Sequence, residues 1–272
     1  MKKKLIALML CMSMVFSMTA CGGSDSESKK DSGDGTEAAD DSGSDVDYIK
    51  DKGTLVIGIT EFEPMDYKDE SGEWIGFDAD MAKLVAEELG VEAEFVVIDW
   101  DSKIMELDSK NIDVVWNGMT LTPEVTSAME CTKAYCNNAQ VVVVPEEKKG
   151  VDLADLTFAV EAGSAGEAAA NDKQFNMNSV ASQADALMEV KSGTSDAAII
   201  DLLMAGAMIG EGTSYTDLIC TEELTTEEYG VGCRKGSDLA EFINGVFEKT
   251  YEDGRMMETA EAYGVQEAVV EQ

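Results

Sequence analysis

The sequence predicts an α/β protein with two similar lobes, and three observations lead to this prediction. Residues 53–116 alternate between β-rich apolar runs and amphipathic runs in the order strand, helix, strand, helix, strand, which is typical of a parallel sheet with flanking helices. The strand runs are apolar without interruption, as expected for a sheet covered on both faces. A second β/α block follows in residues 140–205.

The first block contains five expected elements. The run "GTLVIGI" at residues 53–59 is the first strand. The helix expected at 76–90 has Asp78 as its N-cap and Gly90 at its C-terminal end. The other three elements are a strand at 93–98, a helix at 101–110 and a strand at 112–116.

The second block repeats this pattern, and the chain then returns to the first lobe. The last segment, 238–264, is helical and has no strand of its own. We therefore expect lobe 1 at 48–136 and 231–272, lobe 2 at 137–230, and a ligand in the cleft at the carboxyl ends of both sheets. The elements expected in the second block are a strand at 140–145, a strand, a Gly-Ser turn and a helix within 156–170, a helix at 182–193, and a strand leading into a helix at 195–205. The expected crossings between the lobes lie near 134–139 and 226–230.

The N-terminal segment is expected to lie outside the fold. Lys2, Lys3 and Lys4 precede an apolar stretch of signal-peptide length that ends in "MTAC". This ending resembles a bacterial lipobox, which predicts a signal peptide at 1–20 and lipidation of Cys21. Residues 21–47 are expected to be the lipidated Cys and a disordered acidic tether, because they are rich in Gly, Ser and charged side chains.

Charge and composition exclude several classes of function. The chain has 55 acidic and 20 basic residues and no His, for a formal net charge of −35. Nucleic acid is excluded as a partner because neutralising phosphates needs a basic face. Neither a metal nor a cofactor is expected, since His is absent and no CxxC spacing indicates zinc. The cysteine pairs to test first are Cys131–Cys136 and Cys220–Cys233, with buried free thiols as the alternative.

Four stretches together resemble the family 3 solute-binding proteins of polar amino-acid ABC transporters. They are "GITEFEPMDYKDESGEWIGFDADMAKLVAEELG", "DWDSKIMELDSKNIDVVWNGMTLTPEV", "AVEAGSAGE" and "DAAIID". The resemblance implies a two-lobed periplasmic-binding-protein fold (type II) that closes on one small ligand without chemistry. It also implies a monomer on the extracytoplasmic face of the bacterial cell membrane, held there by its lipid, with ABC permease and ATPase subunits as partners.

The resemblance assigns ligand contacts to positions in the loops of both lobes. Phe62 and Trp100 match the aromatic positions, Gly118 and Thr120 match a Gly-x-Thr motif, and Asp201 matches the acid that pairs with the ligand amine. The turn whose N–H groups bind a carboxylate corresponds to Ser164, Ala165 and Gly166. The remaining candidates, from the same loops, are Thr60, Glu61, Trp116, Asn117, Met119 and Glu161.

Two departures from the family pattern concern charge. Val125 stands where the family usually has an Arg that clamps the ligand carboxylate, and Thr60 replaces an Asp in a loop one residue shorter. Three accounts of the missing Arg stay open. Helix N–H groups at Thr122 and Ser164 bind the carboxylate, or another cation such as Lys103 does. The third account is an amine ligand without a carboxylate, held by Glu61, Glu161 and Asp201 and by the aromatic faces of Phe62, Trp100 and Trp116.

The predicted function is capture of a zwitterionic or cationic amino acid for an ABC importer, without enzymatic activity. One alternative is a protein that binds an amine lacking a carboxylate. Another is a dehydratase-like enzyme on the same fold, with Glu161 and Asp201 as acid and base. A sensory receptor domain is a further alternative, and it would need a partner that supplies the transmembrane and output parts.

Overall fold

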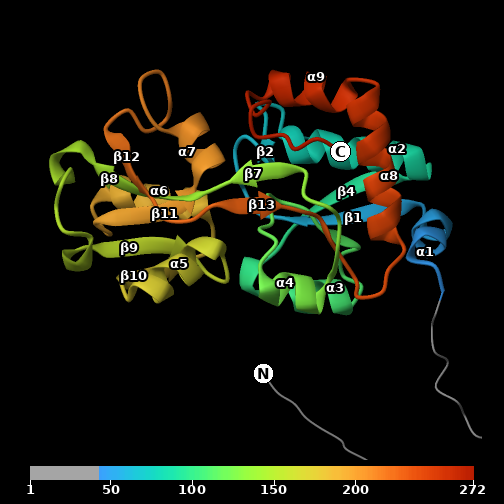
Figure 1. The fold of residues 1–272 in the computed structure, drawn as a ribbon, viewed down its shortest axis with the longest axis horizontal. Coiled ribbons are helices and arrows are strands. Elements are labelled where there is room, and N and C mark those ends of the chain that lie inside the picture. Colours follow the sequence, from blue (N-terminus) through green and yellow to red (C-terminus); the bar gives the residue numbers. More distant parts are fainter. Residues whose placement is uncertain (1–42) are drawn as a thin grey trace, which may run out of the picture. The chain divides into compact units, whose positions relative to one another are not determined.

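Two five-stranded sheets organise the part of the chain that the computed structural model describes, residues 43–272 (Figure 1). In the first sheet, β1 pairs in parallel with β4 and β5, whereas β14 pairs antiparallel with β5 and β6. The sheet is therefore mixed rather than purely parallel, because β14 enters it on the return of the chain. In spatial order, its strands are β4 (Glu92–Val97), β1 (Thr54–Ile59), β5 (Val114–Val115), β14 (Gly232–Cys233) and β6 (Glu130–Cys131).

The second sheet is also mixed. β9 pairs in parallel with β10 and β11, and β8 pairs antiparallel with β11 and β12. The parallel part matches the predicted β/α alternation, whereas the antiparallel pairing of β8, the entry strand, was not predicted. In spatial order, its strands are β10 (Asn176–Val180), β9 (Thr157–Glu161), β11 (Ala197–Asp201), β8 (Gln140–Pro145) and β12 (Leu218–Glu223).

Two short ladders complete the strand pairing. β7 (Cys136–Asn138) and β13 (Glu227–Tyr229) pair antiparallel, and Figure 1 shows them side by side between the two sheets. They fall within the two segments expected to cross between lobes, although the lobe boundaries themselves stay a prediction. β2 (Tyr67–Lys68) pairs antiparallel with β3 (Trp74–Ile75).

Helices cover both faces of each sheet, because alternate strand residues point to opposite faces. In β8, Val141 and Val143 pack in the core cluster that includes α6 and α7, whereas Val142 and Val144 pack on the side of α5. On the first sheet, α1, α2, α8 and α9 share one face, and α3 and α4 lie on the other (Figure 1). The helices are α1 (Asp45–Lys52), α2 (Phe77–Leu89), α3 (Lys103–Asp108), α4 (Pro123–Ala128), α5 (Ala165–Lys173), α6 (Gln183–Ser192), α7 (Leu202–Met208), α8 (Leu239–Glu252) and α9 (Arg255–Ala262).

Three local expectations differ from the structure. Gly76, not Asp78, is the N-cap of α2, and Asp78 lies inside the helix with a fully buried side chain. α1 begins at Asp45, within the segment expected to be tether, because the Ser44 hydroxyl accepts the Asp47 N–H and caps the helix. The helical segment at 238–264 is two helices, which Gly254 separates with a φ of 88°.

All four cysteines of the described residues are free thiols, so the predicted pairing of Cys131 with Cys136 and of Cys220 with Cys233 is wrong in this structure. Cys220 lies on β12 of the second sheet and Cys233 on β14 of the first. Cys131 belongs to the first sheet, whereas Cys136 pairs with β13 in the ladder between the sheets. The fold therefore places the partners of each predicted pair in different sheets.

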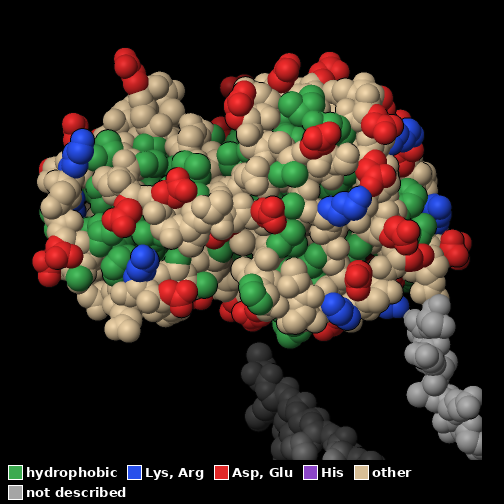
Figure 2. Space-filling view, viewed as in Figure 1, with side chains coloured by type: hydrophobic (Ala, Val, Ile, Leu, Met, Phe, Trp, Pro, Cys, Tyr) green, Lys and Arg blue, Asp and Glu red, His purple; other side chains and the backbone are tan. Residues whose placement is uncertain are grey.

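Carboxylates are more frequent than basic side chains on the face that Figure 2 shows. Figure 2 shows acidic side chains over the whole visible face and basic side chains at fewer places. Within residues 43–272, no helix is long and apolar enough to cross a membrane. The predicted signal peptide and Cys21 lie outside the described residues.

Candidate functional site

A cavity of about 450 Å³ lies where strands of both sheets end. From the first sheet it is lined by residues that follow β4 and β5, and from the second by residues at or after the ends of β9 and β11. Carboxyl ends of strands are the usual place for a ligand in such folds. The cavity therefore lies where the sequence predicted the cleft.

Nine of the fourteen predicted ligand contacts line this cavity, and the other five do not. The lining residues among them are Trp100, Asn117, Gly118, Met119, Thr120, Glu161, Ser164, Ala165 and Asp201. The five outside the lining are Thr60, Glu61, Phe62, Trp116 and Gly166. For all fourteen, contact with a ligand stays a prediction.

The five residues outside the lining have different surroundings. Trp116 is part of the core, with its ring centroid 5.5 Å from that of Phe247. Phe62 is buried beneath Gly118, so that a Cβ atom on Gly118 would lie 2.5 Å from the Phe62 ring. The remaining three are Thr60, which donates to Asn117 Oδ1; Gly166, which packs against the second sheet; and Glu61, which is exposed.

Asp201 is enclosed by hydrogen-bond donors. Its Oδ1 atom accepts from Asn138, from Gln140 Nε2 at 2.8 Å and from the Tyr229 hydroxyl at 2.9 Å. Its Oδ2 atom accepts from Gln183. Burial and, second, the nearby charge of Glu227 raise the pKa of Asp201 to about 7. None of the four donors was predicted, because an amide or hydroxyl at a strand or helix end gives no sequence signal of its own.

Glu161 differs from Asp201 in having an oxygen without a partner. It ends β9, is 2 % exposed, and its Oε1 atom has no hydrogen-bond partner among the described residues. Burial and, second, the charge of Asp201 raise the pKa of Glu161 to about 8, against the opposing effects of Thr60, Lys103 and Gln183. A cation placed beside such a buried and incompletely paired carboxylate would stabilise its charged form.

Lys103 is the one cationic side chain among the described residues that line the cavity. It is 7 % exposed, and its Nζ atom donates to the carbonyl of Trp100 at 3.1 Å and to that of Gly163 at 2.9 Å. The ammonium also lies 4.9 Å from the centroid of the Trp100 ring. Burial lowers the pKa of Lys103, while Glu161 and three further carboxylates oppose this shift.

The two sides of the cavity touch at Gly163. This residue has a φ of 69°, and a Cβ atom on it would lie 2.6 Å from the Cα atom of Asp101. On the side of the first sheet, the buried Asp78 carboxylate accepts the Gly118 N–H at 2.6 Å and so holds the loop after β5. Glycine at positions 118 and 163 therefore allows the backbone of each loop to lie close to its neighbours, Phe62 and Asp101, at the edge of the cavity.

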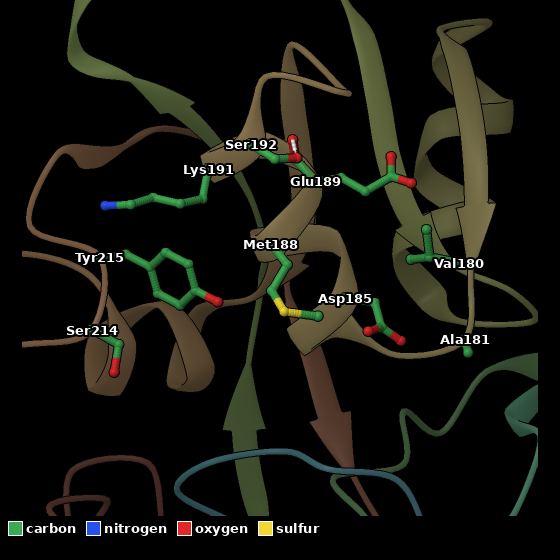
Figure 3. Close-up of a pocket in the computed structure, with 9 residues that line it drawn as sticks. All are labelled: Val180, Ala181, Asp185, Met188, Glu189, Lys191, Ser192, Ser214 and Tyr215. Atoms are coloured by element: carbon green, nitrogen blue, oxygen red, sulfur yellow. Dashed lines mark hydrogen bonds between the residues drawn. The ribbon is translucent and has the colours of Figure 1, made fainter.

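A second hollow, of about 740 Å³, lies over α6 and the segment before β12, and its lining is shown in Figure 3. In that view, Tyr215 and Lys191 lie on one side of Met188, and Val180 and Ala181 on the other. Lys191 forms an ion pair with Asp217. The described lining of this hollow contains no buried polar side-chain atom without a hydrogen-bond partner. The hollow therefore lacks a group like Glu161 Oε1, which is free to bind a ligand in the cavity.

The cavity is suited to binding a small cation or zwitterion. Its lining carries one ammonium, of Lys103, and the carboxylates of Asp101, Glu124, Glu161, Glu167 and Asp201. Trp100 adds an aromatic ring. Within residues 43–272, no group of three or more acidic or thiol side chains is placed to hold a metal ion.

The chain belongs to the bacterial extracellular solute-binding proteins, family 3, whose model matches residues 55–266. It is 28 % identical over 265 residues to the arginine-binding extracellular protein ArtP of Bacillus subtilis, covering 93 % of this chain and 95 % of that protein. It is 30 % identical over 270 residues to the glutamine-binding protein GlnH of the same organism, covering 94 % of each.

Solved structures agree with this assignment. A mutant of ArgBP from T. maritima superposes with a TM-score of 0.75 and 33 % identity, covering 81 % of this chain and 99 % of the other. An ancestral amino acid-binding protein, a precursor of cyclohexadienyl dehydratase, superposes with a TM-score of 0.73 and 30 % identity, covering 81 % and 99 %. The predicted fold class, a two-lobed periplasmic-binding-protein fold, is confirmed by these structures.

Proposed function

We propose that the protein captures an amino acid with a net positive charge, or a zwitterion, and delivers it to the permease of an ABC importer. The observation that carries this proposal is the unpartnered Oε1 atom of Glu161 in a cavity with five carboxylates and one ammonium. Family membership supports the transport role. The arginine-binding relative and the arginine-binding structure support a cationic ligand, whereas the glutamine-binding relative keeps a neutral zwitterion in the same class.

Calorimetric titration against single amino acids tests the ligand class. L-arginine, L-lysine and L-histidine are expected to bind, with L-glutamine as the neutral zwitterion and L-glutamate as the acidic control. A bound ligand raises Tm in proportion to ln(1 + [L]/Kd), so a thermal-shift measurement gives an independent readout. Tight binding of L-glutamate with no binding of the other four would contradict the proposal.

A dehydratase-like enzyme is the second candidate, and one observation favours it. Carboxyl groups with a pKa raised to about 7 and about 8, as for Asp201 and Glu161, are suited to general acid–base work. One structural neighbour, an ancestral amino acid-binding protein, is itself a precursor of cyclohexadienyl dehydratase, which also favours this candidate. We still place binding first, because Asp201 is held by four side-chain donors and Glu161 Oε1 has no partner among the described residues. Release of water or a keto acid from a bound ligand, detected by mass spectrometry, would instead make the enzyme the first candidate.

We further propose that the protein is a monomeric lipoprotein, anchored through Cys21 and closing by a movement of lobe 2 (137–230) toward lobe 1 (48–136 and 231–272). The "MTAC" motif supports the anchor, and the β7–β13 ladder supports a hinge between the lobes. Two acyl chains hold a protein stably on a membrane. The Cys21→Ser variant is therefore expected in the soluble fraction after cell lysis, and membrane retention of that variant would refute lipid anchoring.

A further inference from the structure

Lys103 and Val125 lie on the same side of the cavity, and the first carries a charge whereas the second does not. Lys103 begins α3 and Val125 lies in α4, and both helices cover the same face of the first sheet. Both side chains line the cavity, and Val125 is 6 % exposed. The apolar side chain at position 125 provides no charge, so Lys103 is the one cation that the described lining offers to an anionic group.

We propose that Lys103 binds the carboxylate of the ligand; this inference rests on the proposed function as an amino-acid-binding protein. An ammonium group has three N–H donors. Two of them point to the carbonyls of Trp100 and Gly163, and both acceptors are neutral. One donor and the full positive charge are left for an anion, and a charge-assisted hydrogen bond is the strongest contact such a group makes.

The arrangement of Lys103 and Glu161 fits the two charges of an amino acid. Glu161 is the first charge that opposes the lowered pKa of Lys103, so the two groups interact across the cavity. They nevertheless form no ion pair within 4.0 Å, and Glu161 Oε1 stays unpartnered. A ligand with an ammonium and a carboxylate on one carbon can place the first on Glu161 and the second on Lys103.

The N–H groups at the helix starts are a weaker candidate for the carboxylate. The Thr122 hydroxyl already accepts the Val125 N–H, and the Ser164 hydroxyl accepts the Glu167 N–H. The Gly163 N–H donates to Glu167 Oε2. Several of the N–H groups that a carboxylate would need are thus occupied by side chains of the same turns.

Lys103 also connects ligand binding to contact between the two sides of the cavity. Trp100 follows β4 of the first sheet, and Gly163 follows β9 of the second, so the ammonium bridges them. A carboxylate bound to this ammonium adds a third partner to the bridge. A carboxylate bound there would therefore lie at the contact between the two sides.

The test compares each amino acid with the same molecule lacking its carboxylate. The pairs are L-arginine and agmatine, L-lysine and cadaverine, and L-histidine and histamine, each titrated by calorimetry against the full folded domain. The unaltered protein is expected to bind the amino acid of its preferred pair about ten- to hundredfold more tightly than the amine. Lys103→Met is expected to remove most of this preference, and Lys103→Arg to keep it.

Two further variants complete the design. Lys173→Met, an exposed position on α5, is the matched control and should leave the preference unchanged. Adding Val125→Arg to Lys103→Met should restore the preference, because it returns a cation to the same side of the cavity. The inference is overturned if Lys103→Met keeps the preference, or if the unaltered protein binds amine and amino acid alike. Binding of none of the six compounds, nor of L-glutamine, would instead overturn the proposed function, and the inference with it.

Discussion

The two sides of the cavity bury different charged groups. The side that follows the first sheet offers backbone groups, the Trp100 ring, the buried ammonium of Lys103 and the exposed carboxylates of Asp101 and Glu124. The side that follows the second sheet offers Glu161 and Asp201, the second held by amide donors. Both sides use carboxyl ends of strands, so topology determines where the cavity lies and the side chains at those ends determine its charge. This division suits a ligand that is anionic at one end and cationic at the other.

Glu161 and Asp201 also differ from each other, although both are buried carboxylates. Asp201 accepts four side-chain hydrogen bonds, whereas one oxygen of Glu161 has none. We infer that Asp201 contributes to the fold as well as to binding, and that Glu161 contributes mainly to binding. A pair of charge-removing variants separates the two roles.

Glu161→Gln and Asp201→Asn are expected to give the largest effects. Each removes a buried charge partner of the ligand cation, so Kd should rise at least about thirtyfold, about 2 kcal/mol. Asp201→Asn should also lower the free energy of unfolding of the ligand-free protein by at least about 2 kcal/mol, because four donors point at the two carboxyl oxygens and an Asn amide would place an N–H group against some of them. Glu161→Gln should leave that free energy unchanged or higher at pH 8.5. Urea denaturation and calorimetry give the two quantities.

The exposed Glu222 provides the control for these variants. Glu222→Gln should change neither Kd nor the free energy of unfolding beyond about 0.5 kcal/mol. The distinction between the two buried acids fails if Glu161→Gln destabilises the protein as much as Asp201→Asn does. It also fails if either variant binds the ligand with the affinity of the unaltered protein.

The pH dependence should give the next largest effect. Burial and Asp201 raise the pKa of Glu161 from 4.5 to about 8, so the stability that this group contributes is present below pH 4.5 and is lost as the pH rises through about 8. The ligand-free protein should therefore have a lower Tm at pH 8.5 than at pH 5.

Ligand binding should show the opposite trend. A bound cation favours the ionised form of Glu161, so affinity for L-arginine should rise by up to about tenfold per pH unit between pH 6 and pH 8 and then level off. Proton release measured in buffers of different ionisation enthalpy provides a second readout. Glu161→Gln should reduce the slope of the profile without removing it, because burial also raises the pKa of Asp201 to about 7. An unchanged profile in that variant would assign the whole titration to another group.

Most of the fold was predictable from local sequence, and its exceptions have a physical cause. Apolar runs predicted β1, β4, β8 and the amphipathic helices, because burial on both faces requires such runs. Some of the missed strands, such as β6 and β14, have two residues each and carry no periodicity. The longer strands β10 and β12 were also missed, because most of their residues are polar or exposed and form no apolar run. The pairing of β6 with β14 depends on contacts between residues about a hundred positions apart in the sequence.

The candidate site was predictable to the extent that it follows strand ends. Glu161 and Asp201 end β9 and β11, and a polar residue after an apolar run is a visible signal. Gln140, Gln183 and Glu227 join the same cluster from other elements, and nothing in their own neighbourhood distinguishes them. For Trp116 the same signal was misleading. A Trp after a strand is compatible with the core as well as with a ligand site, and the structure places Trp116 in the core.

The smallest expected effect concerns the place where the two sides touch. Gly163 and Gly193 both have positive φ values, 69° and 75°, so alanine at either position should cost about 1 kcal/mol of stability. A Cβ atom on Gly163 would also lie 2.6 Å from Asp101 Cα, whereas nothing lies within 4 Å of one on Gly193. Gly163→Ala should therefore separate the two sides and weaken ligand binding about three- to tenfold, as overpacking of this kind costs about 1 kcal/mol or more. Gly193→Ala should lower Tm to a similar degree and leave Kd unchanged. If both variants change Kd equally, the contact between Gly163 and Asp101 is not part of the ligand-bound state.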